Sequence, residues 1–326
     1  MERIGANIYV ETVYPGVNVG CIVTDAGGVC IDTPLLPAEA QRWRARIRSW
    51  GVKQVSFVVY TSGQSERTLG TQWLIFEDQP ASKQPLRTEP SGFWQVARAE
   101  RGLFLGRTPP PLKVPEIRRQ SGAVVAQRSA WEQVQEYTSD GFRQSMIDML
   151  GDRDPDMVDL IVVPPHVTFE EQIRLFAGDV EITLIGAAPG TVWIWLPEQQ
   201  VLFAGDTVVV GTHPPLSLVN LHCWIEALEL LRNDPLYKGA QIVPGRGPLT
   251  DVSATEPLIA YLRLACAETE RVVQAGGHKA DLNEIAAELV PFFPVPDGHR
   301  DRIQRQIKLV LDELYDGAKA GDGAGD

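Results

Sequence analysis

TSGQSERTLG, residues 61–70, follows directly on the apolar run VSFVVY and leads into a stretch with helical spacing. A near-continuous apolar run of this length is typical of a strand that is covered on both faces. The loop between such a strand and the next helix is a common place for functional residues. We therefore expect residues 61–70 to form a binding or catalytic loop at the end of a buried strand.

Paired strands precede this loop, and a second set of strands follows much later in the chain. The first sixty residues alternate as a β-meander with a turn at Gly27 and Gly28, followed by the helical pattern PAEAQRWRARIRSWG. Regular patterns return after residue 157 with DLIVVP, IRLFAGDVEITLIG, TVWIWLPEQQVLFAGD, the amphipathic LVNLHCWIEALELLRND and QIVPGRGP. Two β-rich halves, each with helices, predict an α+β fold of αββα layering.

Domain boundaries follow from where the order changes. Residues 1–252 form the expected main domain, and residues 75–157, rich in Pro and Arg, are expected to be an inserted cap or lid within it. Residues 253–319 form an expected C-terminal helical extension with helices at about 254–275, 281–290 and 299–316. The last residues, 320–326, are expected to be disordered.

Composition limits the classes of partner. The chain has 326 residues, a net charge of −12 and a pI near 5.0, which argue against binding along a nucleic-acid backbone. We interpret the one basic run, RWRARIR, as the solvated face of a helix. No apolar run reaches the roughly 18 residues that a membrane span needs, and the first residues lack a signal-peptide pattern. We expect a soluble, cytoplasmic protein without a membrane or nucleic-acid partner.

The four cysteines do not form a recognisable motif. They lie far apart without a C-x-x-C pair, which indicates neither a zinc knuckle nor a redox motif. Cys21 and Cys30 flank the expected hairpin turn, where the two can face each other, and reduced, buried thiols are the favoured interpretation.

The order of these motifs resembles the metallo-β-lactamase superfamily over about residues 5–250. The resemblance lies in NVGCIVTDAGGVCIDTP, VSFVVYTSGQSERTLG, GAAPGTVWIWLPEQQVLFAGD, HP, WIEALELL and IVPGRGP. It implies a four-layer αβ/βα sandwich with a one- or two-metal site between its sheets. Many members of that family use metal-bound hydroxide to hydrolyse esters, thioesters, lactones, lactams or phosphodiesters.

The family's metal-ligand positions carry different residues here. In the family, the loop reads T-H-x-H-x-D-H-T-x-G, and further ligands lie in G-H-T-P-G, V-L-F-x-G-D and V-P-G-H-G. The corresponding positions of this chain hold Ser62, Gln64, Glu66, Arg67, Ala187, Asp206 and Arg246. Only Asp206 keeps the family's residue. Neutral oxygens and an alanine do not make a tight zinc site, and without a metal no group lowers the pKa of the attacking water.

The replacements predict an ion-pair cluster. Two arginines, Arg67 and Arg246, stand where histidines would be, and two carboxylates, Glu66 and Asp206, are expected to face the same space. Because a guanidinium matches carboxylate geometry, we expect both arginines to pair with both carboxylates and fill the metal position. A pocket for a small anionic ligand is the functional alternative.

Three other kinds of site have less support. His213, His222 and Cys223 follow Asp206, but their spacing matches no short metal motif. Ser62 and Ser65 have no histidine nearby in sequence to activate them as nucleophiles, and Arg67 should lower the pKa of Glu66 as a base. Trp193 and Trp195 share one face of a strand, which favours core packing over a ligand wall.

These patterns favour a protein without catalytic residues, metal or cofactor, which binds a small ligand or a protein partner. The partner would be an active relative or a second copy of the chain, with FFPVP at 292–296 as a candidate contact and intrachain packing as its alternative. The competing interpretation is an active hydrolase of the same fold with an atypical metal or with metal-independent chemistry.

Overall fold

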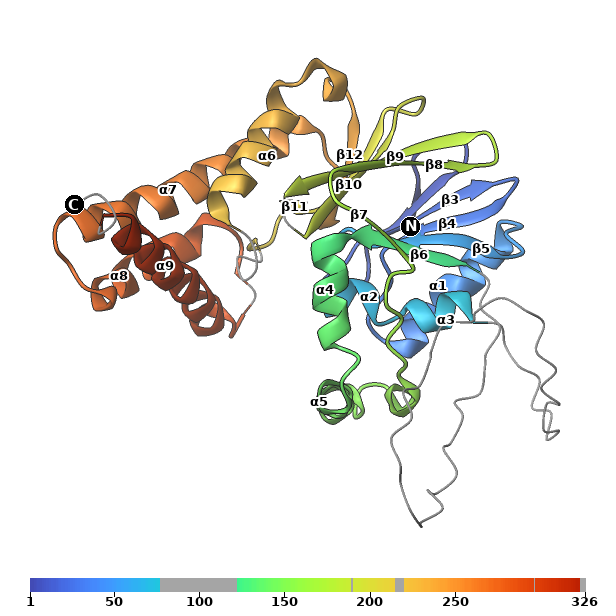
Figure 1. Ribbon diagram of the computed structural model, residues 1–326, viewed down its shortest axis with the longest axis horizontal. Coiled ribbons are helices and arrows are strands. Elements are labelled where there is room, and N and C mark those ends of the chain that lie inside the picture. Colours follow the sequence, from blue (N-terminus) through green and yellow to red (C-terminus); the bar gives the residue numbers. More distant parts are fainter. Residues whose placement is uncertain (77–121, 189, 215–219, 296, 323–326) are drawn as a thin grey trace, which may run out of the picture. The chain divides into compact units, whose positions relative to one another are not determined.

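The structure is a computed structural model that describes residues 1–76, 122–188, 190–214, 220–295 and 297–322. Its centre is two β-sheets that pack face to face (Figure 1). The seven-stranded sheet has the order β1 (Glu2–Arg3), β2 (Ile8–Glu11), β3 (Val19–Thr24), β4 (Gly27–Ile31), β5 (Val55–Val59), β6 (Ala123–Gln127) and β7 (Val167–Phe169). The five-stranded sheet has the order β12 (Gln241–Arg246), β11 (Val201–Val209), β10 (Thr191–Leu196), β9 (Val180–Ala188) and β8 (Gln172–Ala177).

The first sheet changes from antiparallel to parallel pairing part-way along. Strands β1 to β4 are antiparallel, and Cys21 lies directly opposite Cys30 as predicted, both buried and free. Strands β4 to β7 are parallel. Because the carboxyl ends of β4 and β5 meet at one edge, the residues that follow Ile31 and Val59 are brought side by side.

Helices cover the outer face of each sheet. On the first sheet lie α1 (Pro37–Ser49), α2 (Ser65–Thr68) and α3 (Thr71–Ile75), with α4 (Arg128–Glu136) and α5 (Asp140–Leu150) beside them (Figure 1). Helix α1 buries Ala40, Trp43 and Ile47 on one face, as the helical spacing predicts. On the second sheet lies α6 (Leu221–Asn233), whose buried stripe packs in the same core as Trp193 and Trp195. Both tryptophans contact Tyr237 edge to face, so the core interpretation is confirmed.

The predicted C-terminal helices are present. They are α7 (Thr255–Gln274), α8 (Leu282–Leu289) and α9 (Arg300–Asp322), and they share a hydrophobic core with α6. Phe293 is buried against Tyr261 and His213, and Phe292 also contacts the Tyr261 ring although it is 42% exposed, so intrachain packing involves both phenylalanines of the FFPVP segment. Among the described residues, no helix has the length and apolar character needed to cross a membrane.

The expected lid at 75–157 is corrected at its C-terminal side. Residues Ala123–Gln127 form β6, which hydrogen-bonds to both β5 and β7, so this part belongs to the sandwich. The run AVVAQ is too short for periodicity to separate a strand from a helix. Helices α4 and α5 also fall within 75–157 and lie beside the helices on the first sheet. Residues 77–121 of the expected lid lie outside the described residues, as do 323–326 of the expected disordered tail, whereas α9 extends to Asp322.

Candidate functional site

The loop after β5 is fixed at the meeting point of the two sheets. The backbone N–H and the hydroxyl of Thr61 donate to the carboxylate of Asp32, which follows β4, at 2.7 and 2.5 Å. The carbonyl of Thr61 accepts from the backbone N–H of Val192 at 2.8 Å, and Ser62 forms a β-bridge with Thr191. The loop thus bonds to the first sheet through Asp32 and to the second through β10.

Helix α2 turns Arg67 into the space between the sheets. The side chain is fully buried, and its Nη1 donates to Asp32 Oδ2 at 2.7 Å. Its Nη2 donates to Oδ1 of Asp206, near the end of β11. The backbone carbonyl of Arg67 accepts from the N–H and the hydroxyl of Thr33, both at 3.0 Å. A single guanidinium therefore joins a carboxylate of one sheet to a carboxylate of the other.

Arg246, at the end of β12, completes the group. Its Nε and Nη2 lie 3.2 Å from Oδ1 and Oδ2 of Asp206, so both oxygens of that carboxylate bond to guanidinium nitrogens. The four side chains alternate in charge as Asp32, Arg67, Asp206 and Arg246, and we call them the Arg67 cluster. The side chains of Asp32 and Arg67 are 1% and 0% exposed, whereas those of Asp206 and Arg246 are 10% and 23% exposed. Only Arg246 reaches solvent to a substantial extent.

The backbone around the cluster leaves room for nothing larger than hydrogen. A Cβ at Gly245 would lie 2.6 Å from Arg67 Nη2 and would also clash with Asp206. Gly205 has a φ of +54°, and a Cβ there would lie 2.8 Å from Cβ of Thr61. Both glycines are therefore required by the close approach of β11 and β12 to the loop.

The two aspartates stabilise the charged form of Arg67, and the donors around Asp32 oppose the effect of its burial. Burial acts to lower the pKa of Arg67, but the charges of Asp206 and Asp32 more than offset this and raise it. Burial raises the pKa of Asp32, and Arg67 and the two donors of Thr61 oppose that rise. All three partners of Asp32 are donors, and none accepts a carboxyl proton. This is the environment of an ionised carboxylate.

No family model matches the chain, and no curated protein matches it in sequence. Solved structures do match. A metallo-beta-lactamase family protein from Thermus thermophilus aligns with a TM-score of 0.60 and 14% identity, over 98% of this chain and 96% of that one. A beta-lactamase domain protein from Burkholderia ambifaria aligns with a TM-score of 0.59 and 14% identity, over 98% and 88% of the two chains.

The chain has the metallo-β-lactamase fold. The metallo-beta-lactamase DIM-1 also aligns, with a TM-score of 0.51 and 17% identity, over 81% of this chain and 96% of that one. The first two alignments extend beyond the sandwich into the C-terminal region, since residues 1–252 are less than 98% of the chain. At these identities the likeness shows the fold, and the site has to be judged from this chain's own residues.

Within this metallo-β-lactamase fold, the predicted site residues separate into two groups. Arg67, Asp206 and Arg246 are brought together as predicted. The prediction that Glu66 pairs with the arginines of the cluster is wrong. Its carboxylate accepts from the Ser65 hydroxyl at 3.0 Å, and in the described parts of the chain no arginine pairs with it. The second carboxylate of the cluster is instead Asp32.

The other predicted positions, Ser62, Gln64 and Ala187, make no bond to the cluster within the described residues. Ser62 Oγ accepts a long hydrogen bond of 3.4 Å from the N–H of Gln64. Oε1 of Gln64 is buried without a hydrogen-bond partner in the part of the chain that the structure describes. Ala187 is half-buried near the end of β9 and lines an open pocket of about 630 Å³ together with Gln127 and Cys223.

The histidines and their neighbouring cysteine lie elsewhere. His213 packs edge to face against Tyr261 and Phe293, in the core shared with the C-terminal helices. His222 and Cys223 are successive residues in the first turn of α6 and point about 100° apart. Over the residues that the structure describes, no three His, Cys, Asp or Glu side chains are grouped in a way that suits a metal ion.

The residues of the cluster do not fit the zinc site that the fold family implies. Zinc sites use three or four ligands from Cys, His and carboxylate. Both oxygens of Asp206 already accept from guanidinium nitrogens, and Arg67 places a permanent cation between Asp206 and Asp32. A divalent cation at the same place would meet that charge and would lack imidazole ligands from positions 62, 64 and 187.

Proposed function

We propose that this chain is a catalytically inactive protein of the metallo-β-lactamase fold, which works by binding a small ligand or a protein partner. The observation that carries the proposal is the fully buried Arg67, bonded at once to Asp32 and Asp206. Hydrolysis in this fold depends on a cation that activates water. A guanidinium is a cation without open coordination positions, so it holds the carboxylates together and activates nothing.

The ligand class that the cluster favours is a small anion. Arg246 is its one partly exposed member, and the bonds to Asp206 use its Nε and Nη2, which leaves Nη1 outside that contact. Because the two arginines are balanced by two aspartates, the attraction for an anion is short-ranged and limited to direct bonds with Arg246. We expect weak binding of phosphate or carboxylate compounds at this position.

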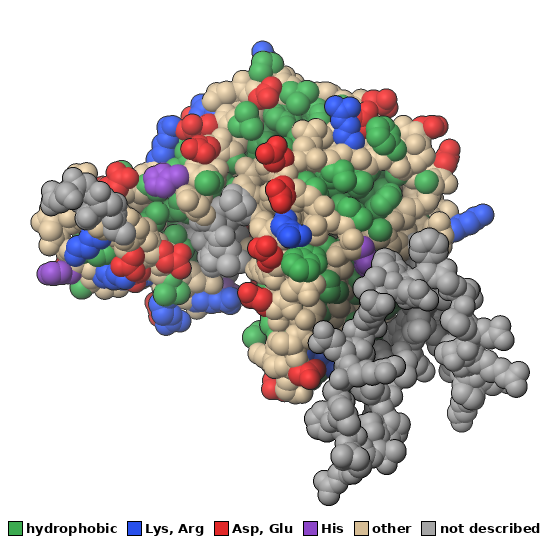
Figure 2. Space-filling view, viewed as in Figure 1, with side chains coloured by type: hydrophobic (Ala, Val, Ile, Leu, Met, Phe, Trp, Pro, Cys, Tyr) green, Lys and Arg blue, Asp and Glu red, His purple; other side chains and the backbone are tan. Residues whose placement is uncertain are grey.

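The partner classes follow from the surface. On the face shown in Figure 2, Lys and Arg side chains are scattered among Asp and Glu side chains and form no continuous stripe. Together with the net charge of −12, this supports a ligand or protein partner over a nucleic acid. An active relative or a second copy of the chain is the partner we propose, with the exposed Phe292 within its contact surface. A cytoplasmic location stays a prediction.

The decisive test is the metal content of the purified chain. The protein is expressed with zinc, iron and manganese supplied, desalted without chelator and measured by elemental analysis beside a metal-dependent protein of the same fold. We expect well below one metal ion per chain and no hydrolysis of esters, thioesters, lactones or lactams. One bound metal per chain, or turnover abolished by a chelator, would overturn the proposal and favour an active hydrolase with an atypical site.

A further inference from the structure

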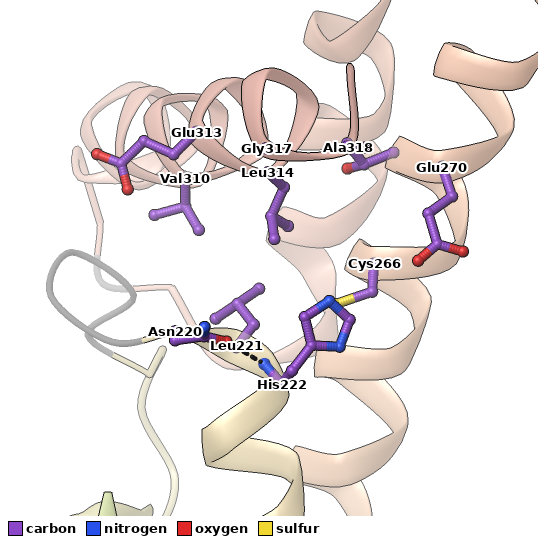
Figure 3. Close-up of a pocket in the computed structure, with 11 residues that line it drawn as sticks. Asn220, Leu221, His222, Cys266, Glu270, Val310, Glu313, Leu314, Gly317 and Ala318 are labelled. Atoms are coloured by element: carbon purple, nitrogen blue, oxygen red, sulfur yellow. Dashed lines mark hydrogen bonds between the residues drawn. The ribbon is translucent and has the colours of Figure 1, made fainter. Parts of the chain in front are cut away.

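A second pocket lies among the C-terminal helices and shares no residue with the Arg67 cluster. Its volume is about 740 Å³, within the range of small-molecule sites. Figure 3 shows it between the first turn of α6 and the helices α7 and α9. Its apolar wall is formed by Leu221, Cys266, Val310 and Leu314. Side chains of all three helices therefore form one apolar surface, against which the apolar part of a ligand can lie.

Two carboxylates line this pocket from opposite helices. Glu270 comes from α7 and Glu313 from α9, and neither forms an ion pair within the described residues. Basic side chains of the same region are already paired with other acidic residues. These pairs are Arg271–Glu268, Lys308–Asp312 and Lys279–Asp316. Because these three basic side chains are paired elsewhere, none of them neutralises the two carboxylates of the pocket.

The His222 imidazole also lines the pocket, beside Cys266, whereas the other polar groups are already bonded or neutral. The side chain of Asn220 accepts from the backbone N–H groups of His222 and Cys223 at 3.0 and 3.4 Å, so the start of α6 is capped and does not offer these donors to an anion. The Thr269 hydroxyl donates to the carbonyl of Ala265 at 2.8 Å. Burial, with a smaller effect of Glu270, raises the pKa of the Cys266 thiol to about 11, so this thiol is neutral and belongs to the apolar wall.

We propose that this pocket binds an organic ammonium ion with an apolar body. The ammonium group lies against Glu270 or against Glu313, which Figure 3 shows on opposite sides of the pocket, and the apolar body lies against Leu221, Val310 and Leu314. A charged hydrogen bond to a carboxylate supplies orientation, and burial of the carbon chain supplies affinity. The proposal goes beyond the function proposed above, because it needs neither an inactive sandwich nor a ligand at Arg246.

The test uses the full chain and three probes of equal chain length: octylammonium, octanoate and octanol. Binding is measured by saturation-transfer NMR and isothermal titration calorimetry at matched ionic strength. We expect octylammonium to bind at least tenfold more tightly than octanol, and octanoate to bind more weakly than either. Equal binding of the three probes, or tighter binding of octanoate, would show that the carboxylates select no cation and would overturn the proposal.

Variants locate the binding. The double variant E270Q/E313Q should weaken octylammonium binding about tenfold or more and leave octanol binding unchanged. The control E284Q/E288Q removes the same charge from α8, outside the pocket lining, and should have little effect. Leu314→Trp fills the pocket and should weaken both octylammonium and octanol. If E270Q/E313Q binds octylammonium as the wild type does, or if both double variants weaken it equally, the assignment fails.

Discussion

Replacement of Arg67 by methionine tests whether the guanidinium is the cation that holds the two sheets together at this site. Methionine keeps much of the apolar stem and removes the charge. It leaves Asp32, which is 1% exposed, and Asp206, which is 9% exposed, facing each other across the vacated space, with Arg246 bonded to Asp206 only. The change therefore removes the one cation that bonds to both carboxylates.

The magnitude follows from the burial of the pair. Removal of one partner of a buried ion pair costs about 3–5 kcal/mol, because the other charge is left without compensation. We expect Arg67→Met to lower the free energy of unfolding by about 4 kcal/mol at pH 7, out of the roughly 5–15 kcal/mol of an ordinary domain. In urea, this shifts the unfolding midpoint down by about 1–2 M. The eight tryptophans provide the fluorescence signal.

The pH dependence separates lost charge pairing from lost packing. Without Arg67, burial and mutual repulsion raise the folded-state pKa of Asp32 and Asp206 above their unfolded value of about 4. A raised folded-state pKa penalises the ionised forms, so the penalty is full at pH 7 and disappears as the pH falls below the unfolded value. The difference in stability between wild type and Arg67→Met should therefore shrink from pH 7 to pH 4.

Two controls make the result interpretable. Arg263→Met breaks the exposed pair with Glu229 and should cost at most about 1 kcal/mol. The triple variant D32N/R67M/D206N removes the carboxylates along with the guanidinium and should recover more than half of the loss. If Arg67→Met lies within about 1 kcal/mol of wild type at pH 7, or if its deficit does not depend on pH, the reasoning about the Arg67 cluster is refuted.

Three smaller predictions concern stability, the first two in the same urea assay and the third by thermal unfolding. Arg246→Ala should cost about 1–2 kcal/mol, less than Arg67→Met, because Arg246 is partly exposed and Asp206 keeps its bond to Arg67; an equal or larger loss would place the main cation at Arg246. Gly245→Ala should cost at least about 2 kcal/mol, since its Cβ meets both charged groups, and a neutral effect would contradict the close packing. Burial lowers the pKa of His213, so the contribution of this residue to stability is complete above the unfolded pKa of about 6.5 and declines as the pH falls below that value. The thermal midpoint should therefore drop between pH 7.5 and 5.5. His213→Gln should reduce that drop, whereas the exposed control His299→Gln should not.

The sequence predicted the members of the cluster that come from family motifs, because those motifs lie at strand ends that the sandwich brings together. It assigned the wrong carboxylate on α2. Glu66 and Arg67 are adjacent in a helical turn, where side chains point about 100° apart, so only one of them can enter the site. Arg67 enters because Asp32 and Asp206 are already there to receive it.

The position of Asp32 at a strand end is visible in the sequence, but no motif spacing distinguishes it as a site residue. It is the acidic residue in GVCIDTP, at the carboxyl end of β4, and β5 pairs with β4 in parallel. An acidic residue at the end of a buried strand is expected to need a partner on the neighbouring strand end. Asp32 has two partners, Thr61 and Arg67. The parallel register of β4 and β5 alone does not identify Arg67 as one of them.

The two buried aspartates constrain what can replace a metal at this place. As long as Asp32 and Asp206 stay ionised between the sheets, some cation has to lie between them, and a side chain that supplies it gains the pairing energy without the cost of recruiting an ion from solution. A lysine would supply one point charge, whereas the planar guanidinium of Arg67 donates from separate nitrogens to both carboxylates. In the function that we propose, structural closure and water activation are thereby separated, because a guanidinium has no coordination position for a reacting water.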